Sequence, residues 1–189
     1  MPLLTTQSAK SYGLNRYISL ATNSYEAIGT AMGTGSSGTI TFSSIPSTYK
    51  HLQLRIFNNT SRVSAPSGSG RMRFNGDTVA TNYYTHYIYT TGAGTANGGA
   101  NNENYGMFYN GDTTTFAASI VDILDYADTN KKTTARIYTG FDKNDGAGQT
   151  AFVGLFWNNT AAINEIVLFA DGGYTWGSNS RFSLYGIKG

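Results

Sequence analysis

The chain contains no cysteine and only three prolines among its 189 residues. Without cysteine, disulfide scaffolds, cysteine-ligated zinc sites, thiol nucleophiles and thiol redox motifs are all excluded. No stretch approaches the ~18 consecutive apolar residues that a membrane-spanning helix needs. The first residues also lack the basic and apolar regions of a secretory signal. We therefore expect no membrane insertion.

Charge is equally sparse, with 13% charged residues, a formal net charge of +2 and basic residues scattered along the chain. Nucleic-acid-binding proteins usually gather their basic residues on one face. Here the pair Arg71 and Arg73 alternates with Met72 and Phe74, a pattern typical of a strand with one polar and one buried face. We therefore expect no nucleic-acid partner.

The chain is rich instead in glycine, tyrosine and phenylalanine, with 23, 14 and 10 residues respectively. This aromatic and β-branched content argues against disorder, and the length suggests a single domain. Residues 50–56 alternate cleanly, which places Leu52, Leu54 and Ile56 on the inner side of a strand. About nine or ten such short runs, without heptads or alternating helices, predict an all-β, antiparallel sandwich of two sheets.

Turn signals separate these runs. The tetrapeptide Asn-Gly-Asp-Thr occurs at residues 75–78 and again at 110–113, and both copies predict type I′ turns. Residues 92–102 contain mainly Gly, Ala, Thr and Asn, which predicts a long exposed loop. Residues 119–126 allow a helix, but their β-branched content and the turn that follows favour a strand in a hairpin.

The composition changes near Ser24. Residues 1–24 are mostly polar and lack a sustained apolar period, whereas strand patterns begin at Tyr25. Such a segment cannot bury itself, so it is either a loose terminus or an extended arm that docks on another protein. We expect an N-terminal docking arm over residues 1–24 and a β-sandwich over residues 25–189.

No catalytic, metal or cofactor-binding set emerges from the sequence. His51 and His86 are the only histidines, and neither has an evident partner in a Gly-x-Ser-x-Gly or metal motif. Asp122 and Asp125 are three residues apart on an expected strand, so they project to opposite faces. Residues 142–146 resemble the opening of a calcium loop but lack its later oxygen ligands, which favours a plain turn. We expect no enzyme activity.

The tyrosine-rich segment at residues 83–89 predicts a binding or interface surface. Tyrosine combines an apolar ring of few rotors with a hydroxyl group, which suits protein interfaces and sugar rings. The alternative is that half of these tyrosines fill the core. The residues expected at this surface are Tyr83, Tyr84, His86, Tyr87, Tyr89, Tyr105 and Tyr109.

Four segments resemble a recurring module of tailed-bacteriophage virion proteins, which occurs alone or as the tip domain of longer tail fibres. These segments are residues 40–55 (Ile-Thr-Phe-Ser-Ser-Ile-Pro through Leu-Arg), 73–77, 120–126 and 181–187. The resemblance implies a jelly-roll-like sandwich on the outside of a phage particle, commonly assembled as an oligomer. It implies no chemistry, because no catalytic set belongs to these segments.

From this resemblance we expect a non-enzymatic virion structural protein that is assembled in the host cytoplasm. Its expected role is a tail-associated fibre or host-recognition protein, docked on other virion proteins through residues 1–24. It is expected to form a homo-oligomer, a trimer, and to contact a host surface glycan. One alternative is capsid decoration that stabilises the head. Another is a carbohydrate-active enzyme, which would need two close carboxylates in a groove.

Overall fold

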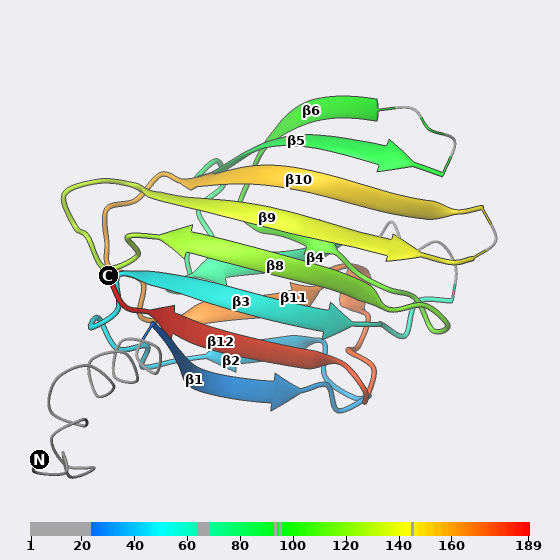
Figure 1. The fold of residues 1–189 in the computed structure, drawn as a ribbon, viewed down its shortest axis with the longest axis horizontal. Helices are drawn as coiled ribbons and strands as arrows, with labels where there is room; N and C mark the ends of the chain where they lie inside the picture. The colour runs from blue at the N-terminus through cyan, green and yellow to red at the C-terminus, as the bar shows by residue number, and fades with distance from the viewer. Residues whose placement is uncertain (1–23, 64–68, 93, 95, 145) are drawn as a thin grey trace, which may run out of the picture.

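The computed structural model describes residues 24–63, 69–92, 94, 96–144 and 146–189 (Figure 1). Its regular elements there are strands and one short 3₁₀ turn, η2 (Asp171–Gly173), so the all-β prediction is confirmed. The strands are β1 (Tyr25–Met32), β2 (Thr39–Phe42), β3 (His51–Asn58), β4 (Ser69–Phe74), β5 (Tyr83–Thr91), β6 (Ala96–Glu103), β7 (Gly106–Tyr109), β8 (Ala117–Leu124), β9 (Thr133–Asp142), β10 (Gly148–Trp157), β11 (Ile166–Ala170) and β12 (Arg181–Ile187).

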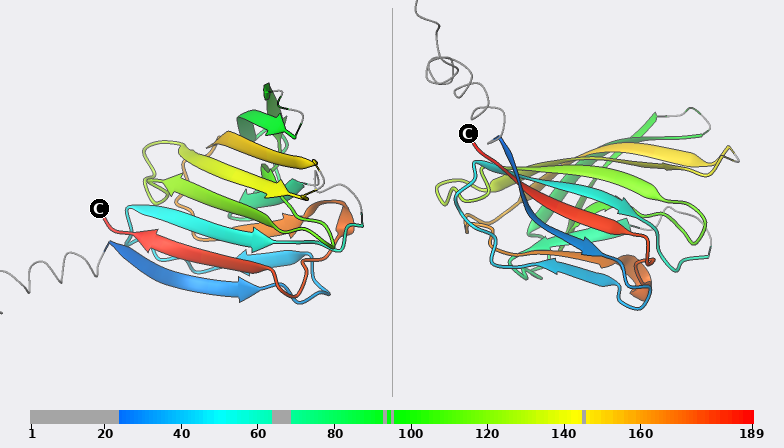
Figure 2. Two further views of the ribbon diagram at one scale, coloured as in Figure 1. Left: turned by 45° about the vertical axis from the view of Figure 1, so that its right-hand side comes forward. Right: turned by 60° about the horizontal axis from the view of Figure 1, so that its bottom comes forward.

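Two antiparallel sheets of unequal width form a sandwich, as the sequence predicts. The wide sheet has the order β1-β12-β3-β8-β9-β10-β5-β6, and the narrow sheet has the order β2-β11-β4-β7. Figures 1 and 2 show the narrow sheet behind one face of the wide sheet, while no further layer of strands from the described residues covers the other face. This second face is called the outer face below.

The core lies between the sheets and follows from strand alternation. Leu52, Leu54 and Ile56 of β3 are buried, as are Met72 and Phe74 of β4, in agreement with the sequence pattern. Burying each such side chain contributes about 1.5–3 kcal/mol relative to leaving it exposed. The strand expected over residues 119–126 is confirmed as far as Leu124, where β8 ends, because β8 pairs with both β3 and β9, and the helix alternative is wrong.

The two Asn-Gly-Asp motifs adopt different structures. Asn75 and Gly76 have φ values of 51° and 64°, and Asp77 N donates to Phe74 O at 2.9 Å, so the first motif is the expected I′ turn. Asn110 and Gly111 have no positive φ. A Cβ on Gly111 would lie 1.9 Å from Thr115 O, which shows that close backbone packing, not turn geometry, requires this glycine.

The predicted loop at residues 92–102 is wrong over most of its length. Strand β6 begins at Ala96 and pairs with β5 without a break, from Thr90 opposite Ala96 to Tyr83 opposite Glu103. The side chains of β6 are small and mostly exposed, so the strand is held by its backbone ladder. A strand without large apolar side chains shows no alternation of apolar and polar residues, so its sequence does not reveal it.

The expected docking arm lies almost wholly outside the described residues, which begin at Ser24. Strand β1 starts at Tyr25, where the sequence pattern places the start of the sandwich. No helix in the described ranges is long and apolar enough to cross a membrane.

Candidate interaction surface

The tyrosine-rich strand β5 sends its side chains to both faces of the wide sheet. Tyr84 and His86 project from the outer face and are exposed. Tyr83 projects inward and is fully buried, and its hydroxyl oxygen accepts a hydrogen bond from Phe74 N at 2.9 Å. The prediction that Tyr83 belongs to a surface is therefore wrong, because adjacent residues of a strand face opposite sides.

The remaining predicted tyrosines lie on the inner side or in a loop. Tyr87 and Tyr89 project inward from β5 and are half-buried. Tyr109 is buried among them, and this burial raises the pKa of its hydroxyl to about 12. Tyr105 precedes β7, and the Arg71 guanidinium lies 4.0 Å from the centre of its ring. The seven predicted residues thus form no single surface, and Tyr109 is corrected to a core residue.

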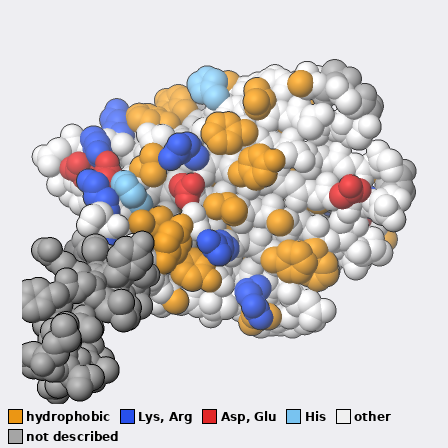
Figure 3. Space-filling view, viewed as in Figure 1, with side chains coloured by type: hydrophobic (Ala, Val, Ile, Leu, Met, Phe, Trp, Pro, Cys, Tyr) orange, Lys and Arg blue, Asp and Glu red, His pale blue; other side chains and the backbone are white. Residues whose placement is uncertain are grey.

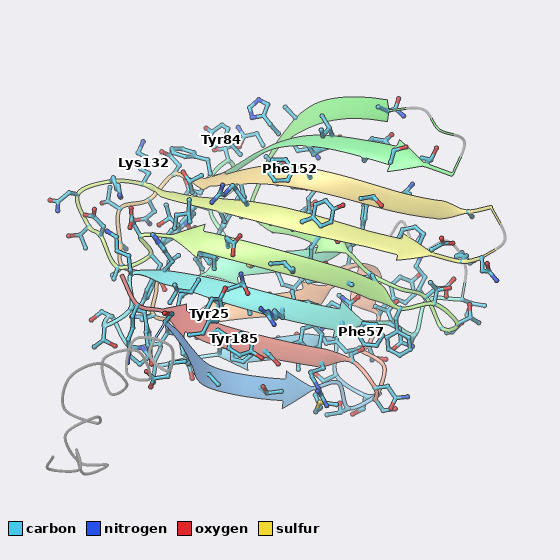
Figure 4. All side chains as sticks on the ribbon, viewed as in Figure 1. Tyr25, Phe57, Tyr84, Lys132, Phe152 and Tyr185 are labelled. Atoms are coloured by element: carbon cyan, nitrogen blue, oxygen red, sulfur yellow. The ribbon has the colours of Figure 1, made fainter. Side chains whose placement is uncertain are left out.

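The outer face instead carries a row of large apolar side chains that the sequence analysis did not select. Ile120, Tyr138, Phe152 and Ile88 stand directly opposite one another on β8, β9, β10 and β5. Between 44% and 64% of each side chain is exposed. We call these four residues the outer ridge. Figure 4 shows Phe152 standing out from this face.

A row of small residues runs beside the outer ridge, two positions further along β9. Cross-strand pairing links its members in sequence across the sheet. We call this row the outer groove, and it consists of Ala118, Gly140, Thr150, Thr90 and Ala96. Two shallow hollows of about 440 and 240 Å³ lie along it. Among the described residues no carboxylate lines either hollow, so neither holds a pair of carboxylates, and Arg55 lines the larger one.

Polar residues border the outer ridge on the side away from the outer groove. Asp122 and Arg136 stand opposite each other on β8 and β9, and both side chains share the outer face. Gln53 Nε2 donates to Asp122 Oδ1 at 2.7 Å, and Arg55 Nε donates to Gln53 Oε1 at 3.0 Å. Beyond the groove, at the end of β9, lies the exposed Asp142.

Aromatic clusters occupy the margins of the outer face, and Figure 4 labels members of each. Phe57 stacks on Phe116 with ring centres 4.5 Å apart. At another margin the Arg55 guanidinium lies 5.4 Å from the Tyr185 ring centre. Tyr84 packs at 6.1 Å from Phe156. Figure 3 shows apolar side chains spread across the face with only a few charged groups among them.

Two acidic side chains, Asp112 and Asp125, are held by structural partners. Asp112 is buried, which alone would raise the pKa of its carboxyl, but hydrogen bonds from Thr114, Thr115 and Lys143 lower that pKa to about 2. Ion pairs with Lys131 and Lys50 lower the pKa of Asp125 to about 2. No group of three or more histidine, aspartate or glutamate side chains within the described ranges is arranged to hold a metal ion.

No family model, curated protein or solved structure matches this chain. The evidence that the outer ridge is an interaction surface therefore comes from the structure and the sequence of this chain. A sequence signal for it does exist: residues 151–157 (Ala-Phe-Val-Gly-Leu-Phe-Trp) are apolar without alternation. An uninterrupted apolar strand is typical of one that is covered on both faces.

Proposed function

We propose that the protein is a non-enzymatic structural protein on the surface of a tailed-bacteriophage virion, and that its outer face is an adhesive surface between proteins. The observation that carries the adhesive role is the outer ridge, because monomeric proteins rarely expose contiguous apolar patches larger than a few hundred Å². The virion role rests on the resemblance of residues 40–55 and 181–187 to phage virion modules.

The chain path supports a jelly-roll-like reading of the sandwich. From β2 onward the chain alternates between the sheets: β2, β4, β7 and β11 belong to the narrow sheet, and the strands between them belong to the wide sheet. The order β1-β12-β3-β8 in the wide sheet and the order β2-β11-β4-β7 in the narrow sheet match the two four-stranded sheets of a jelly roll, and β9, β10, β5 and β6 extend the wide sheet beyond β8.

The arrangement of carboxylates favours a structural role over glycoside hydrolysis. That chemistry needs two carboxylates that flank a substrate groove. Asp77 instead accepts hydrogen bonds from Trp157 and Asn82, and Asp171 pairs with Arg71. Incubation of the pure protein with host surface polysaccharide should therefore release no new reducing ends. Their appearance would replace the structural proposal with an enzymatic one.

The location in the particle decides between the two structural roles. Immunogold labelling of particles of the encoding phage, with antibodies against the purified chain, is the direct test. Label at the tail supports a tail-associated or host-recognition role, and label across the head supports capsid decoration. Particles without label, alongside a labelled known virion protein, would refute the virion proposal.

Attachment through residues 1–24 is part of the same proposal. Removal of residues 1–23 leaves Ser24, whose carbonyl accepts a hydrogen bond from Lys188 N at 3.2 Å. We expect the truncated chain to fold but to be missing from purified particles. Incorporation at the level of the full chain would show that the attachment lies elsewhere.

A further inference from the structure

We infer that the outer faces of two copies of this chain pack together, with the outer ridge of each copy seated in the outer groove of the other. This inference rests on the adhesive role proposed for the outer face, for which it names the partner, and it does not depend on a virion role. It starts from shape: the ridge and the groove are parallel, both cross β8, β9, β10 and β5, and they lie about 7 Å apart, the distance spanned by two residues of a strand. A surface with a ridge beside a matching groove is complementary to itself.

One symmetry operation brings the two rows together. A two-fold axis that runs parallel to the ridge, midway between ridge and groove, exchanges the two rows between copies. Along β9 this axis passes over Thr139, so Tyr138 meets Gly140 of the second copy. On the neighbouring strand Phe152 meets Thr150 of the second copy. Large side chains thereby face small ones at every step, and facing sheets about 10 Å apart interdigitate in this way.

The same operation pairs opposite charges. Arg136 and Asp142 lie three residues before and three residues after Thr139 on β9, and both are exposed. The axis over Thr139 therefore sets Arg136 of one copy opposite Asp142 of the second copy, and the reverse pair forms by symmetry. Within one copy these residues are about 20 Å apart, too far to interact.

The size of the face suits a stable contact. Three rows across five strands, with strands about 4.8 Å apart and rows about 6.8 Å apart, together with the pair Asp142 and Gly148, give a projected area of about 550 Å² per copy. The accessible area of a corrugated face exceeds its projection, so the contact approaches the roughly 800 Å² per partner of a standard interface. The apolar centre and charged border also match the composition of such interfaces. A two-fold contact predicts a pair of copies, in place of the trimer expected from the sequence.

Charge reversal tests the inference with the full chain. Sedimentation equilibrium should give the mass of a dimer for the wild type. Arg136→Asp and Asp142→Arg should each weaken association roughly ten-fold or more, because like charges then face each other twice. The double variant R136D/D142R should restore association to near the wild-type value, since each pair is complementary again. Circular dichroism verifies that all three variants are folded.

A control variant separates this contact from general charge effects. Glu103→Lys changes the charge by the same amount on exposed β6, opposite Tyr83 and hence on the inner side of the sheet. It should leave association unchanged. Three outcomes would each overturn the inference. They are a wild type that is monomeric at tens of micromolar, single-reversal variants that associate as strongly as the wild type, and a double variant that associates as weakly as the single variants.

Discussion

Trp157 donates its indole N–H to Asp77 Oδ2 at 2.8 Å, which ties the last residue of β10 in the wide sheet to the turn after β4 in the narrow sheet. The same carboxylate accepts hydrogen bonds from Val79 N and Asn82 Nδ2, both at 2.9 Å. Burial alone would raise the pKa of Asp77, but these hydrogen bonds outweigh it and lower the pKa. The first Asn-Gly-Asp motif therefore positions an acceptor that joins the two layers.

Asp77→Ala should destabilise the fold by on the order of 1–3 kcal/mol, because it leaves a buried indole N–H without an acceptor. Asp77→Asn keeps one acceptor oxygen and should cost less. Urea unfolding followed by tryptophan fluorescence measures both. Equal losses for the two variants would show that the Trp157 contact contributes nothing specific.

Gly111→Ala should destabilise the fold by about 3 kcal/mol or more, since its Cβ would overlap backbone oxygens that cannot move independently. Gly154→Ala is the matched control, because a Cβ there would meet only His86 O at 3.8 Å. We expect the control to change stability by no more than about 0.5 kcal/mol. Thermal unfolding measures both variants. Equal falls of the two unfolding midpoints would contradict the conclusion that close backbone packing requires a glycine at position 111.

Asp112 makes the free energy of unfolding depend on pH in the acidic range. Its folded-state pKa of about 2 lies below the ordinary value of 3.8, so its contribution is fully present above pH 4 and is lost as the pH falls towards 2. Asp112→Asn should therefore reduce the free energy of unfolding at pH 7, and the difference from wild type should shrink at pH 2.5. A difference that stays constant with pH would contradict the role of the ionised carboxylate.

Tyr83 and Tyr84 provide a test of strand alternation. Tyr83→Phe removes the buried hydroxyl that accepts from Phe74 N and should cost about 1–2 kcal/mol. Tyr84→Phe changes an exposed side chain and should leave stability within about 0.5 kcal/mol of wild type. Chemical denaturation distinguishes the two, and a larger loss for Tyr84→Phe would reverse the assignment of faces.

Strand alternation also shows which buried side chains can be predicted from the sequence. Alternation in residues 50–56 places Leu52, Leu54 and Ile56 correctly, because one side of that strand is polar. The tyrosine run of β5 gives no such contrast, so it does not reveal that Tyr83 is buried and Tyr84 is not. The face of a uniformly aromatic strand is set by its neighbours.

The outer ridge and β6 were missed for related reasons. The ridge is a row across four strands whose members are distant in sequence, so it exists only once the register of Ile120, Tyr138, Phe152 and Ile88 is known. Strand β6 depends on backbone pairing with β5, and the residues of Ala96–Glu103 carry no trace of it. Strand β6 arises from backbone pairing that composition and periodicity do not encode, whereas the ridge leaves a partial signal in the apolar run of residues 151–157.

The most direct test of the central claim measures whether the outer face is covered in solution. Hydroxyl-radical footprinting of the full chain, at submicromolar and at high micromolar concentration, reports the exposure of individual aromatic side chains. Tyr138 and Phe152 should become protected several-fold at high concentration, while Tyr174, which is exposed next to η2, should be oxidised equally at both. Equal oxidation of Tyr138 and Phe152 at both concentrations would contradict a contact between copies through the outer face.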